Sequence, residues 1–340
     1  MATLQFAIFG AGFWSGYQLP GWLETGLVEC VAVCDPSREK AVALANRFGI
    51  NAIFTSPEEV FANIQLDFID ICSPVETHAP LARMAADHGI NVVCQKPLST
   101  TLDDATALVE YCETKKVMLL VNENFRWQDP IRRLKKQMQE GNIGTLFRAR
   151  VDYRSSFPVF DNQPFLKTLE QFIITDMGTH ILDIARFLFG EATSLYCTTY
   201  RVHRDIQGED VATVMLTMEN SITVVVELSY ATLREHDRFP ETYIEIEGAD
   251  GFLELAPDMW IRETTKQGTL AKREVLHHYE WANPAYDLIH TSIATCQTHL
   301  ARALAGLEEA ETSGRDNLAT LELVFKAYES ARTGQSIMLK

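Results

Sequence analysis

Two patterns of apolar residues divide the chain near residue 125. Before that point, short and nearly continuous apolar runs alternate with stretches in which apolar residues recur at helical spacing. Continuous apolar runs are typical of parallel strands that are buried on both faces. We expect strands at residues 4–9, 28–34, 52–54, 68–72, 91–94 and 117–121. Helical spacing at residues 39–48, 78–88 and 103–114 then predicts a parallel sheet covered by helices on both sides.

Beyond residue 125, several strands follow one another with few helices between them. Helices are expected at residues 130–141, 176–189, 285–305 and 315–333. Strands are expected at residues 146–153, 194–202, 211–218, 221–231, 242–247, 252–255, 259–263 and 337–339. Successive strands without intervening helices form mostly antiparallel sheets. We therefore predict an α/β protein with domains at 1–122 and 123–340, the second built on a large open, mostly antiparallel sheet. Its C-terminal helix can pack back on the first domain.

The turn after the first expected strand carries glycines at a telling spacing. The first expected strand is followed by Gly10 and Gly12, and the second expected strand is followed by Asp35. Gly10 permits a tight turn, and Gly12 lets a pyrophosphate approach the backbone at a helix N-terminus. A carboxylate at the tip of the second strand accepts hydrogen bonds from ribose hydroxyls. Ser15 replaces the third glycine of the usual pattern. The glycines alone would also suit another α/β turn, but Asp35 favours a dinucleotide site.

Composition narrows the class of partner and the compartment. Of the 340 residues, 46% are hydrophobic, and the formal net charge is −16. Nucleic-acid binders present basic surfaces, so DNA, RNA and anionic membranes are not expected as partners. No apolar run is long enough to span a bilayer, and the first apolar stretch fits a strand rather than a signal peptide. The seven cysteines form no C-x-x-C pair, which favours buried free thiols in a cytoplasmic protein.

Two clusters carry groups that can move protons. Lys96-Pro97 follows the fifth expected strand, and a lysine held there can polarise a substrate oxygen. An ordinary surface lysine would fit the same position. Asp176, His180 and Asp183 fall on one face of the expected helix, and a histidine beside carboxylates is a good general base. The same three residues would also suit a capped helix N-terminus or a divalent-metal site.

These motifs occur in an order that resembles one protein family over nearly the whole chain. The glycine loop is followed by Ser73-Pro74 with His78, Lys96-Pro97, Asn124-Phe125-Arg126 and Asp176-x-Gly-x-His180-x-x-Asp183. The chain resembles the Gfo/Idh/MocA oxidoreductases, which include glucose–fructose oxidoreductase, inositol dehydrogenase and related sugar dehydrogenases. The resemblance implies an N-terminal Rossmann domain and NAD(P)-dependent hydride transfer between nicotinamide and a hydroxyl of a sugar, inositol or sugar acid. It also implies a homodimer or homotetramer formed through the C-terminal sheet.

The resemblance assigns roles to individual residues. His180 would take the hydroxyl proton, Lys96 would polarise the reacting oxygen, and Asp176 would bind substrate and position both. The residues implied in cofactor binding are Gly10, Gly12, Phe13, Trp14, Asp35, Arg38, Ser73, Pro74, His78, Gln95 and Asn124. Besides Lys96, Asp176 and His180, the candidate substrate-binding residues are Arg126, Tyr153, Arg154 and Lys167. The cations among them could hold a carboxylate, or they could lie on solvated faces. No metal is expected. NAD is favoured over NADP, because Asp35 would repel the 2′-phosphate of NADP.

Two departures from the family pattern affect the expected site. The usual Glu-Lys-Pro is Gln95-Lys96-Pro97, so Lys96 lacks a negative neighbour. A glycine pair before the catalytic aspartate is replaced by residues 170–175, whose larger side chains predict a bulkier pocket wall. Three alternative functions remain. The protein could be an oxidoisomerase that recycles a bound cofactor or a dinucleotide-binding regulator without turnover. It could also be a metal-dependent isomerase or hydrolase that uses the His180 cluster.

Overall fold

The computed structural model describes residues 3–339, which form two compact units. The first unit runs up to Asn124 and also includes Ile293–Leu321. The second comprises Phe125–Ser292 and the residues from Glu322 onward. The chain thus passes into the second unit close to the predicted boundary after residue 122. The predicted second segment, 123–340, is interrupted, because residues 293–321 pack with the first unit. Gln297 Nε2, for example, donates to Gln18 O at 3.1 Å.

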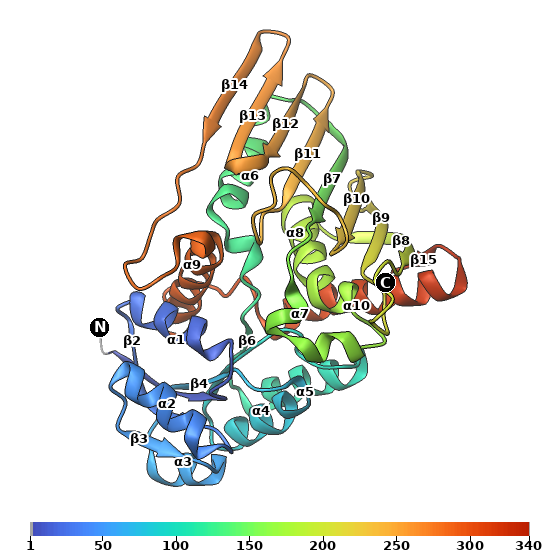
Figure 1. The fold of residues 1–340 in the computed structure, drawn as a ribbon. Coiled ribbons are helices and arrows are strands. Elements are labelled where there is room, and N and C mark those ends of the chain that lie inside the picture. Colours follow the sequence, from blue (N-terminus) through green and yellow to red (C-terminus); the bar gives the residue numbers. More distant parts are fainter. Residues whose placement is uncertain (1–2, 340) are drawn as a thin grey trace. The chain divides into compact units, whose positions relative to one another are not determined.

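The first unit contains a six-stranded sheet in the order β3-β2-β1-β4-β5-β6, with every pairing parallel (Figure 1). Its strands are β1 (Leu4–Phe9), β2 (Val28–Cys34), β3 (Ala52–Phe54), β4 (Phe68–Ile71), β5 (Asn91–Cys94) and β6 (Leu119–Val121). Successive residues of β1 and β4 are buried although they point to opposite faces, so both faces of the sheet are covered. The predicted parallel sheet is confirmed.

Helices alternate with these strands. They are α1 (Ser15–Glu24), α2 (Arg38–Phe48), α3 (Pro57–Asn63), α4 (His78–Asp87) and α5 (Leu102–Lys115). The sequence pattern did not predict α3, which has only seven residues and begins with a proline at its first turn. Because all six strands are parallel, their carboxyl ends meet at one edge of the sheet. Gly10, Asp35, Ser73 and Lys96 follow four of those ends.

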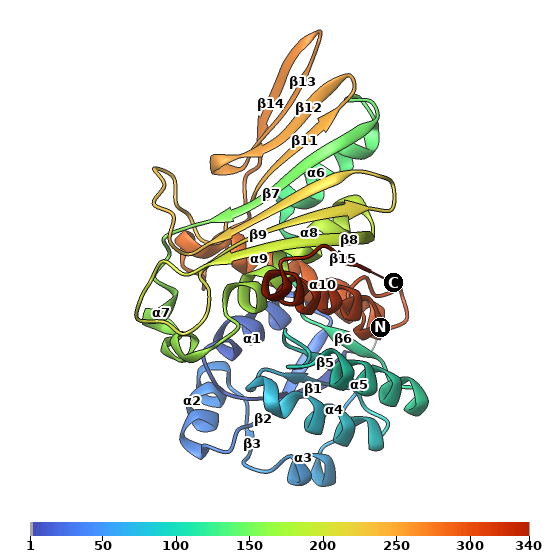
Figure 2. The same ribbon diagram turned by 90° about the vertical axis from the view of Figure 1, so that its right-hand side faces the viewer.

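The second unit contains a nine-stranded sheet in the order β14-β13-β12-β11-β7-β10-β9-β8-β15 (Figure 2). Its strands are β7 (Leu146–Arg154), β8 (Ala192–Tyr200), β9 (Val211–Met218), β10 (Thr223–Ser229), β11 (Tyr243–Gly248), β12 (Gly251–Ala256), β13 (Trp260–Thr265), β14 (Gly268–Arg273) and β15 (Ile337–Met338). Only β7 and β10 pair in parallel, and the other pairings are antiparallel. The predicted large, mostly antiparallel sheet is confirmed.

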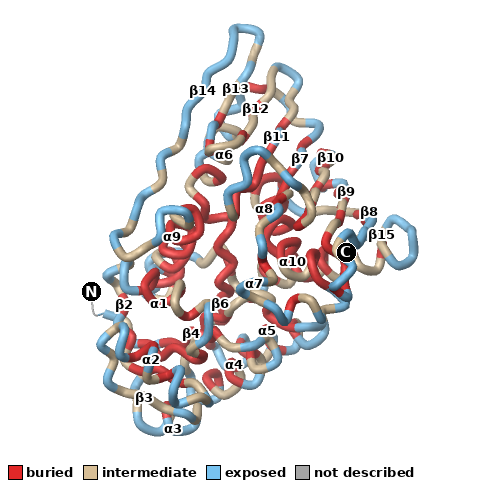
Figure 3. Tube along the Cα trace, viewed as in Figure 1, coloured by how far each residue is buried: buried red, intermediate tan, exposed pale blue. Residues whose placement is uncertain are grey.

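One face of this large sheet is covered and the other is open. Along β9, Val214 and Leu216 are buried, whereas Met215 between them is 47% exposed. Helices α6 (Asp129–Glu140) and α8 (Thr179–Phe189) pack on the buried face, against β12 and against β7 and β10 respectively. The short α7 is Val159–Asn162. Strand β14 is exposed along its whole length and so shows no alternation, which explains why it was not predicted (Figure 3).

Two long helices complete the described chain. They are α9 (Asp287–Leu304) and α10 (Gly314–Thr333), and each contributes residues to both units.

The helix predicted at 176–189 differs at its start: the wide π-helical turn Ile174–Gly178 precedes α8. All seven cysteines are buried free thiols, as predicted. Over residues 3–339, no helix has the length and apolar character needed to cross a bilayer.

Candidate active site

The two glycines of the loop between β1 and α1 differ in the space around them: Gly10 is tightly packed and Gly12 is not. Gly10 has a φ of +103°, and a Cβ there would lie 2.5 Å from Cys72 O, so only glycine fits. Around Gly12, by contrast, no atom lies within 4 Å of the place a Cβ would take. Ser15 Oγ donates to Gly12 O at 2.6 Å and so closes the turn in place of the third glycine. The exposed backbone at Gly12, at the start of a helix, fits a pyrophosphate.

Asp35 ties the second strand to this loop. One carboxylate oxygen accepts from Ala11 N at 2.7 Å, and the other accepts from Ser37 N at 2.8 Å. Each oxygen keeps a further lone pair, so ribose hydroxyls can still donate to it. Asp35 therefore has a structural role that the sequence did not predict, in addition to its expected one. Arg38 begins α2 and is exposed.

Aromatic side chains lie at the start of α1. The Phe13 ring packs edge-on against Trp14, with ring centroids 5.5 Å apart, and Phe13 is one of the exposed large apolar residues. Both were expected to bind cofactor, and both directly follow the open backbone of Gly12 in the chain.

His78 links the ends of β4 and β5 and differs from its expected role. It is buried, and its Nδ1 and Nε2 lie 3.0 Å from Pro97 O and 2.9 Å from Ser73 O. Burial lowers the pKa of His78, while the two carbonyls act in the opposite direction. Because backbone oxygens face both ring nitrogens, His78 holds the loops that carry Ser73-Pro74 and Lys96-Pro97 rather than presenting a nitrogen to a cofactor.

Gln95 supplies an observation that points to a bound group. Its Nε2 is buried, and it has no hydrogen-bond partner among the described residues. Buried amide donors nearly always have a partner, so this one fits an acceptor on a ligand. With the open backbone of Gly12 and the acceptors of Asp35, the first unit fits a dinucleotide. Asn124 is buried at the end of the same unit.

In the second unit, Asp176 lies in the π-helical turn and is held by a tyrosine. Tyr230 OH donates to Asp176 Oδ2 at 3.0 Å, and the Tyr153 ring meets the Tyr230 ring edge-on at 5.7 Å. Burial raises the pKa of both tyrosines, so their hydroxyls stay protonated. The adjacent Gly178 packs on Leu228 of β10, where a Cβ would lie 3.2 Å from Leu228 Cδ1. Short π-helical turns recur at functional sites.

His180, at the start of α8, is stacked on an aromatic ring. The Phe125 and His180 rings are nearly parallel, with 6° between their planes and 3.7 Å between centroids. His180 is 4% exposed. The stack fixes the plane of the imidazole, which a general base needs for aligned proton transfer.

Arg126 and Asp183 form a buried bidentate ion pair. Arg126 Nε donates to Asp183 Oδ2 at 2.7 Å, and Arg126 Nη2 donates to Asp183 Oδ1. Two expectations change as a result. The carboxylate three residues after His180 is neutralised by an arginine, and the arginine expected to bind substrate is committed to that carboxylate. Both residues thus fix α8 relative to the 3-10 turn Phe125–Trp127.

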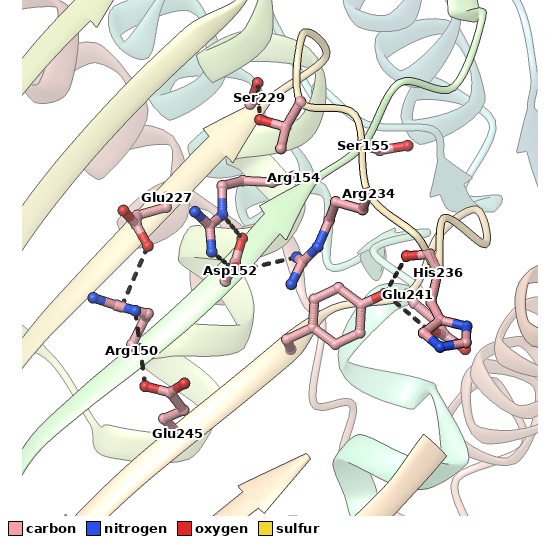
Figure 4. Close-up of polar contacts among 12 residues, drawn as sticks. Arg150, Asp152, Arg154, Ser155, Glu227, Ser229, Arg234, His236, Glu241 and Glu245 are labelled. Atoms are coloured by element: carbon pink, nitrogen blue, oxygen red, sulfur yellow. Dashed lines mark hydrogen bonds and ion pairs between the residues drawn. The ribbon is translucent and has the colours of Figure 1, made fainter. Parts of the chain in front are cut away.

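Arg154 and Lys167 each pair with a carboxylate other than Asp176. Consecutive strand residues point to opposite faces, so Tyr153 lies on the covered face of the sheet and Arg154 on the open face. Figure 4 shows Arg154 among the open-face charges, where its Nε and Nη2 bind Asp152 at 2.7 and 2.6 Å. Lys167 Nζ pairs with Asp205 at 2.7 Å, which lowers the pKa of Asp205.

Comparison with known proteins matches both units. The model of an oxidoreductase family with an NAD-binding Rossmann fold matches residues 4–123, and that of the GFO/IDH/MocA C-terminal domain matches residues 131–254. A D-apiose dehydrogenase from Paraburkholderia graminis is 42% identical over 98% of this chain and 89% of its own length. The chain belongs to the Gfo/Idh/MocA oxidoreductase family.

Two further relatives extend the match. A D-apiose dehydrogenase from Rhizobium rhizogenes is 38% identical over 99% of this chain and 98% of its own length. The crystal structure of an Agrobacterium radiobacter oxidoreductase in complex with NAD+, L-tartaric acid and magnesium superposes with a TM-score of 0.97 at 38% identity. It covers 99% of this chain and 98% of the other. The predictions of a Gfo/Idh/MocA fold, of a dehydrogenase and of NAD as cofactor are confirmed.

Two contacts of the candidate site were not predicted from the sequence. Tyr230 ends up against Asp176 although 54 positions separate them, and no motif marks it. Phe125 belongs to a recognised motif, but nothing in the sequence indicated that it stacks on His180. In residues 3–339 we found no group of three or more His, Cys, Asp or Glu side chains arranged to hold a metal ion.

Proposed function

We propose that this Gfo/Idh/MocA protein is an NAD-dependent dehydrogenase of D-apiose or a closely related pentose. The observation that carries the proposal is the 42% and 38% identity, over nearly the whole chain, to two proteins named D-apiose dehydrogenase. More distant relatives named for D-xylose and myo-inositol are only 25% and 24% identical. An aldopentose is therefore favoured over an inositol.

Oxidation of a sugar hydroxyl requires a base for the proton and an acceptor for the hydride. His180 is the proposed base, because its ring is fixed in one plane by Phe125. Asp176, held by the Tyr230 hydroxyl, is proposed to accept a hydrogen bond from a sugar hydroxyl. Lys96 is proposed to donate to the reacting oxygen. When bound, the nicotinamide ring supplies the hydride-accepting chemistry.

Cofactor binding is proposed for the open edge of the first unit. Gly12, Phe13 and Trp14 would contact the pyrophosphate and its surroundings, and Asp35 would accept from the ribose hydroxyls. Ser73-Pro74 and the free amide donor of Gln95 would lie along the rest of the cofactor. His78 acts by holding those loops.

The substrate test is an absorbance assay for NADH with purified protein. D-Apiose, D-xylose, levoglucosan, myo-inositol and L-tartrate are supplied with NAD or NADP, with and without a chelator. We expect D-apiose to give a kcat/KM at least about 10-fold above the other compounds, a preference that one or two pocket contacts can supply. NADH formation that chelation abolishes would show that a metal ion takes part in the reaction. Protein that retains NAD through purification and gives no net NADH would favour internal recycling or a regulator.

The role of Lys96 is tested with Lys96→Met, which keeps the side-chain length and removes the ammonium. We expect kcat to fall by roughly 10²-fold or more, the usual contribution of a positioned proton donor, while NAD binding stays within about 2-fold. The matched control is Lys40→Met on the exposed face of α2. Unchanged turnover in Lys96→Met would remove the lysine from the mechanism.

The open face of the large sheet is the proposed contact between subunits of a homodimer or homotetramer. Its centre carries the alternating charges Arg150, Glu227 and Glu245, joined by ion pairs of 3.3 and 3.9 Å (Figure 4). Beside them, β8 and β9 expose Tyr196 and Met215 on the same face. Light scattering after size-exclusion chromatography tests this: Met215→Glu should yield monomers, and an unchanged mass would contradict the proposed interface.

A further inference from the structure

The backbone that leads into Asp176, residues 167–173, is hydrogen-bonded to a second segment, residues 207–209. Gln207 N donates to Lys167 O at 2.9 Å, and Ile173 N donates to Glu209 O at 3.2 Å. Gly208 makes this approach possible, since a Cβ there would lie 2.6 Å from Leu169 O. Residues 167–173 and 207–209 therefore run close together, and a side chain at position 208 would push them apart.

The Glu209 side chain accepts most of the hydrogen bonds at this contact between the two segments. Its carboxylate is nearly buried, and Oε1 accepts from Phe172 N at 3.2 Å and from Ile174 N at 3.2 Å. The same oxygen accepts from the hydroxyl of Tyr328, which lies in α10, at 2.8 Å. A carboxylate can only accept, and hydrogen bonds to a charged acceptor are the stronger kind. Three donors from two distant segments thus converge on one oxygen.

Tyr328 extends the contact to the residue next to Asp176. Its hydroxyl oxygen accepts from Thr175 N at 3.1 Å and lies 3.1 Å from Thr175 Oγ1. Burial raises the pKa of Tyr328, so the hydroxyl remains a donor to Glu209. Glu209 and Tyr328 together bind the backbone N–H groups of residues 172, 174 and 175.

Two routes lead from Glu209 to the Asp176 carboxylate. The first passes through Tyr328 and Thr175 to the Asp176 backbone. The second passes through Phe172, whose ring stacks on Tyr230 at 5.6 Å with 10° between the planes. Tyr230 in turn donates to Asp176 Oδ2. Backbone and carboxylate of Asp176 are therefore both held by contacts that meet at Glu209.

We propose that Glu209 and Tyr328 are positioning residues for Asp176, acting as a hydrogen-bonded clamp on residues 172–175. The proposal rests on the role proposed above for Asp176 in binding the sugar. The clamp orders the backbone of the segment that leads into Asp176.

The test uses Glu209→Gln and Tyr328→Phe in the full-length protein, with Glu113→Gln and Tyr111→Phe as matched controls. Glu113 pairs with Arg315 and Tyr111 donates to Asp87, both at the exposed surface of the first unit. Three quantities are measured: hydrogen–deuterium exchange of a peptide containing residues 169–178, kcat and KM for the sugar, and Kd for NAD.

We expect faster exchange in that peptide and a fall in kcat/KM for the sugar of about 10- to 100-fold, because small misplacements of a substrate-binding group are costly. The Kd for NAD should stay within about 2-fold, since cofactor affinity does not depend on Asp176 in this scheme. A merely structural role would lower the melting temperature without this selective loss. Should Glu209→Gln fail to fold, Tyr328→Phe, which removes a single oxygen, carries the test.

Exchange at the wild-type rate in Tyr328→Phe, or faster exchange with unchanged kcat/KM, would overturn the proposal. Wild-type protein that oxidises no sugar would instead overturn the proposed function. The clamp itself would then be judged by the exchange measurement alone, with unchanged exchange rejecting it.

Discussion

Phe125 and His180 form a face-to-face pair in which the ring centroids are 3.7 Å apart. The pair joins the 3-10 turn Phe125–Trp127 to the first turn of α8. Next to it, Arg126 and Asp183 make a second link between the same two elements. The imidazole is therefore held through its ring face, and the helix that carries it is held through a buried ion pair.

Phe125→Leu removes the stacking but keeps an apolar side chain of similar size. Aromatic pairs contribute about 0.5–1.5 kcal/mol beyond their buried area, so we expect kcat/KM to fall by up to roughly 10-fold. Steady-state kinetics measures the loss, and thermal unfolding checks that the variant is folded. The control is Phe165→Leu, whose ring is exposed. An unchanged kcat/KM in Phe125→Leu would show that the stack does not orient the base.

The two glycines of the β1–α1 loop should respond differently to alanine. In Gly10→Ala the Cβ meets Cys72 O and the backbone is strained, so we expect the free energy of unfolding to fall by about 1–3 kcal/mol. In Gly12→Ala the methyl enters open space, and stability should change little. The Kd for NAD should nevertheless rise at least about 10-fold, because the methyl occupies the path of the pyrophosphate. Scanning calorimetry measures the stability of both variants, and titration calorimetry measures their Kd for NAD. Unchanged NAD affinity in Gly12→Ala would place the cofactor elsewhere.

Asp35→Asn tests cofactor choice. The amide keeps the size of the side chain and loses the negative charge that would face the 2′-phosphate of NADP. We expect the ratio of kcat/KM for NAD to that for NADP to fall by roughly 10-fold, equivalent to about 1.4 kcal/mol. One of the contacts to Ala11 N and Ser37 N weakens as well, so stability should fall by about 1 kcal/mol. Kinetics with both cofactors, together with urea unfolding, separates the two effects; an unchanged ratio would contradict the role of the charge.

The parallel sheet could be predicted from the sequence because its strands are buried on both faces and appear as unbroken apolar runs. The glycine loop and the Asp176–His180 motif were recognisable because their residues are close together in the chain. The partners of that motif were not. Tyr230 and Phe125 reach Asp176 and His180 only after distant segments have folded together.

Predictions for neighbouring residues were also wrong where successive side chains of a strand point to opposite faces of the sheet. Tyr153 and Arg154 were both assigned to substrate binding, but successive residues of β7 point to opposite sides of the sheet. Similarly, the helix through Asp176 and Asp183 placed both carboxylates near His180, but no motif indicated that Arg126 neutralises the second one. Periodicity predicts which face a side chain occupies, not which partner it finds there.

Asp70, in the middle of β4, should make the stability of the protein depend on pH. It is fully buried, Trp22 Nε1 donates to its Oδ2 at 2.8 Å, and its Oδ1 has no partner among the described residues. Burial raises the pKa of Asp70 from 3.8 to about 7, against the opposing effect of the Trp22 hydrogen bond. The folded state therefore holds a proton on Asp70 at pH values where the unfolded chain has released it.

The sign follows from proton linkage. Below pH 3.8 both states are protonated and ionisation of Asp70 carries no penalty, whereas above about pH 7 the penalty is complete. Between these values the contribution of Asp70 lowers the free energy of unfolding by up to about 1.36 kcal/mol per pH unit. Asp70→Asn cannot ionise, so its stability relative to wild type should rise between about pH 4 and about pH 7 and then level off. Urea unfolding followed by tryptophan fluorescence measures this difference.

Asp87→Asn provides a control of opposite sign. Lys115 and Tyr111 hydrogen-bond to the exposed Asp87 and lower its pKa. Removing its charge should therefore lower stability slightly at pH values above 3.8, the ordinary pKa of this carboxyl. A pH-independent difference between Asp70→Asn and wild type would show that Asp70 does not hold a proton in the folded state. A difference that rises with pH in Asp70→Asn, but not in Asp87→Asn, would assign the pH dependence to the buried carboxyl.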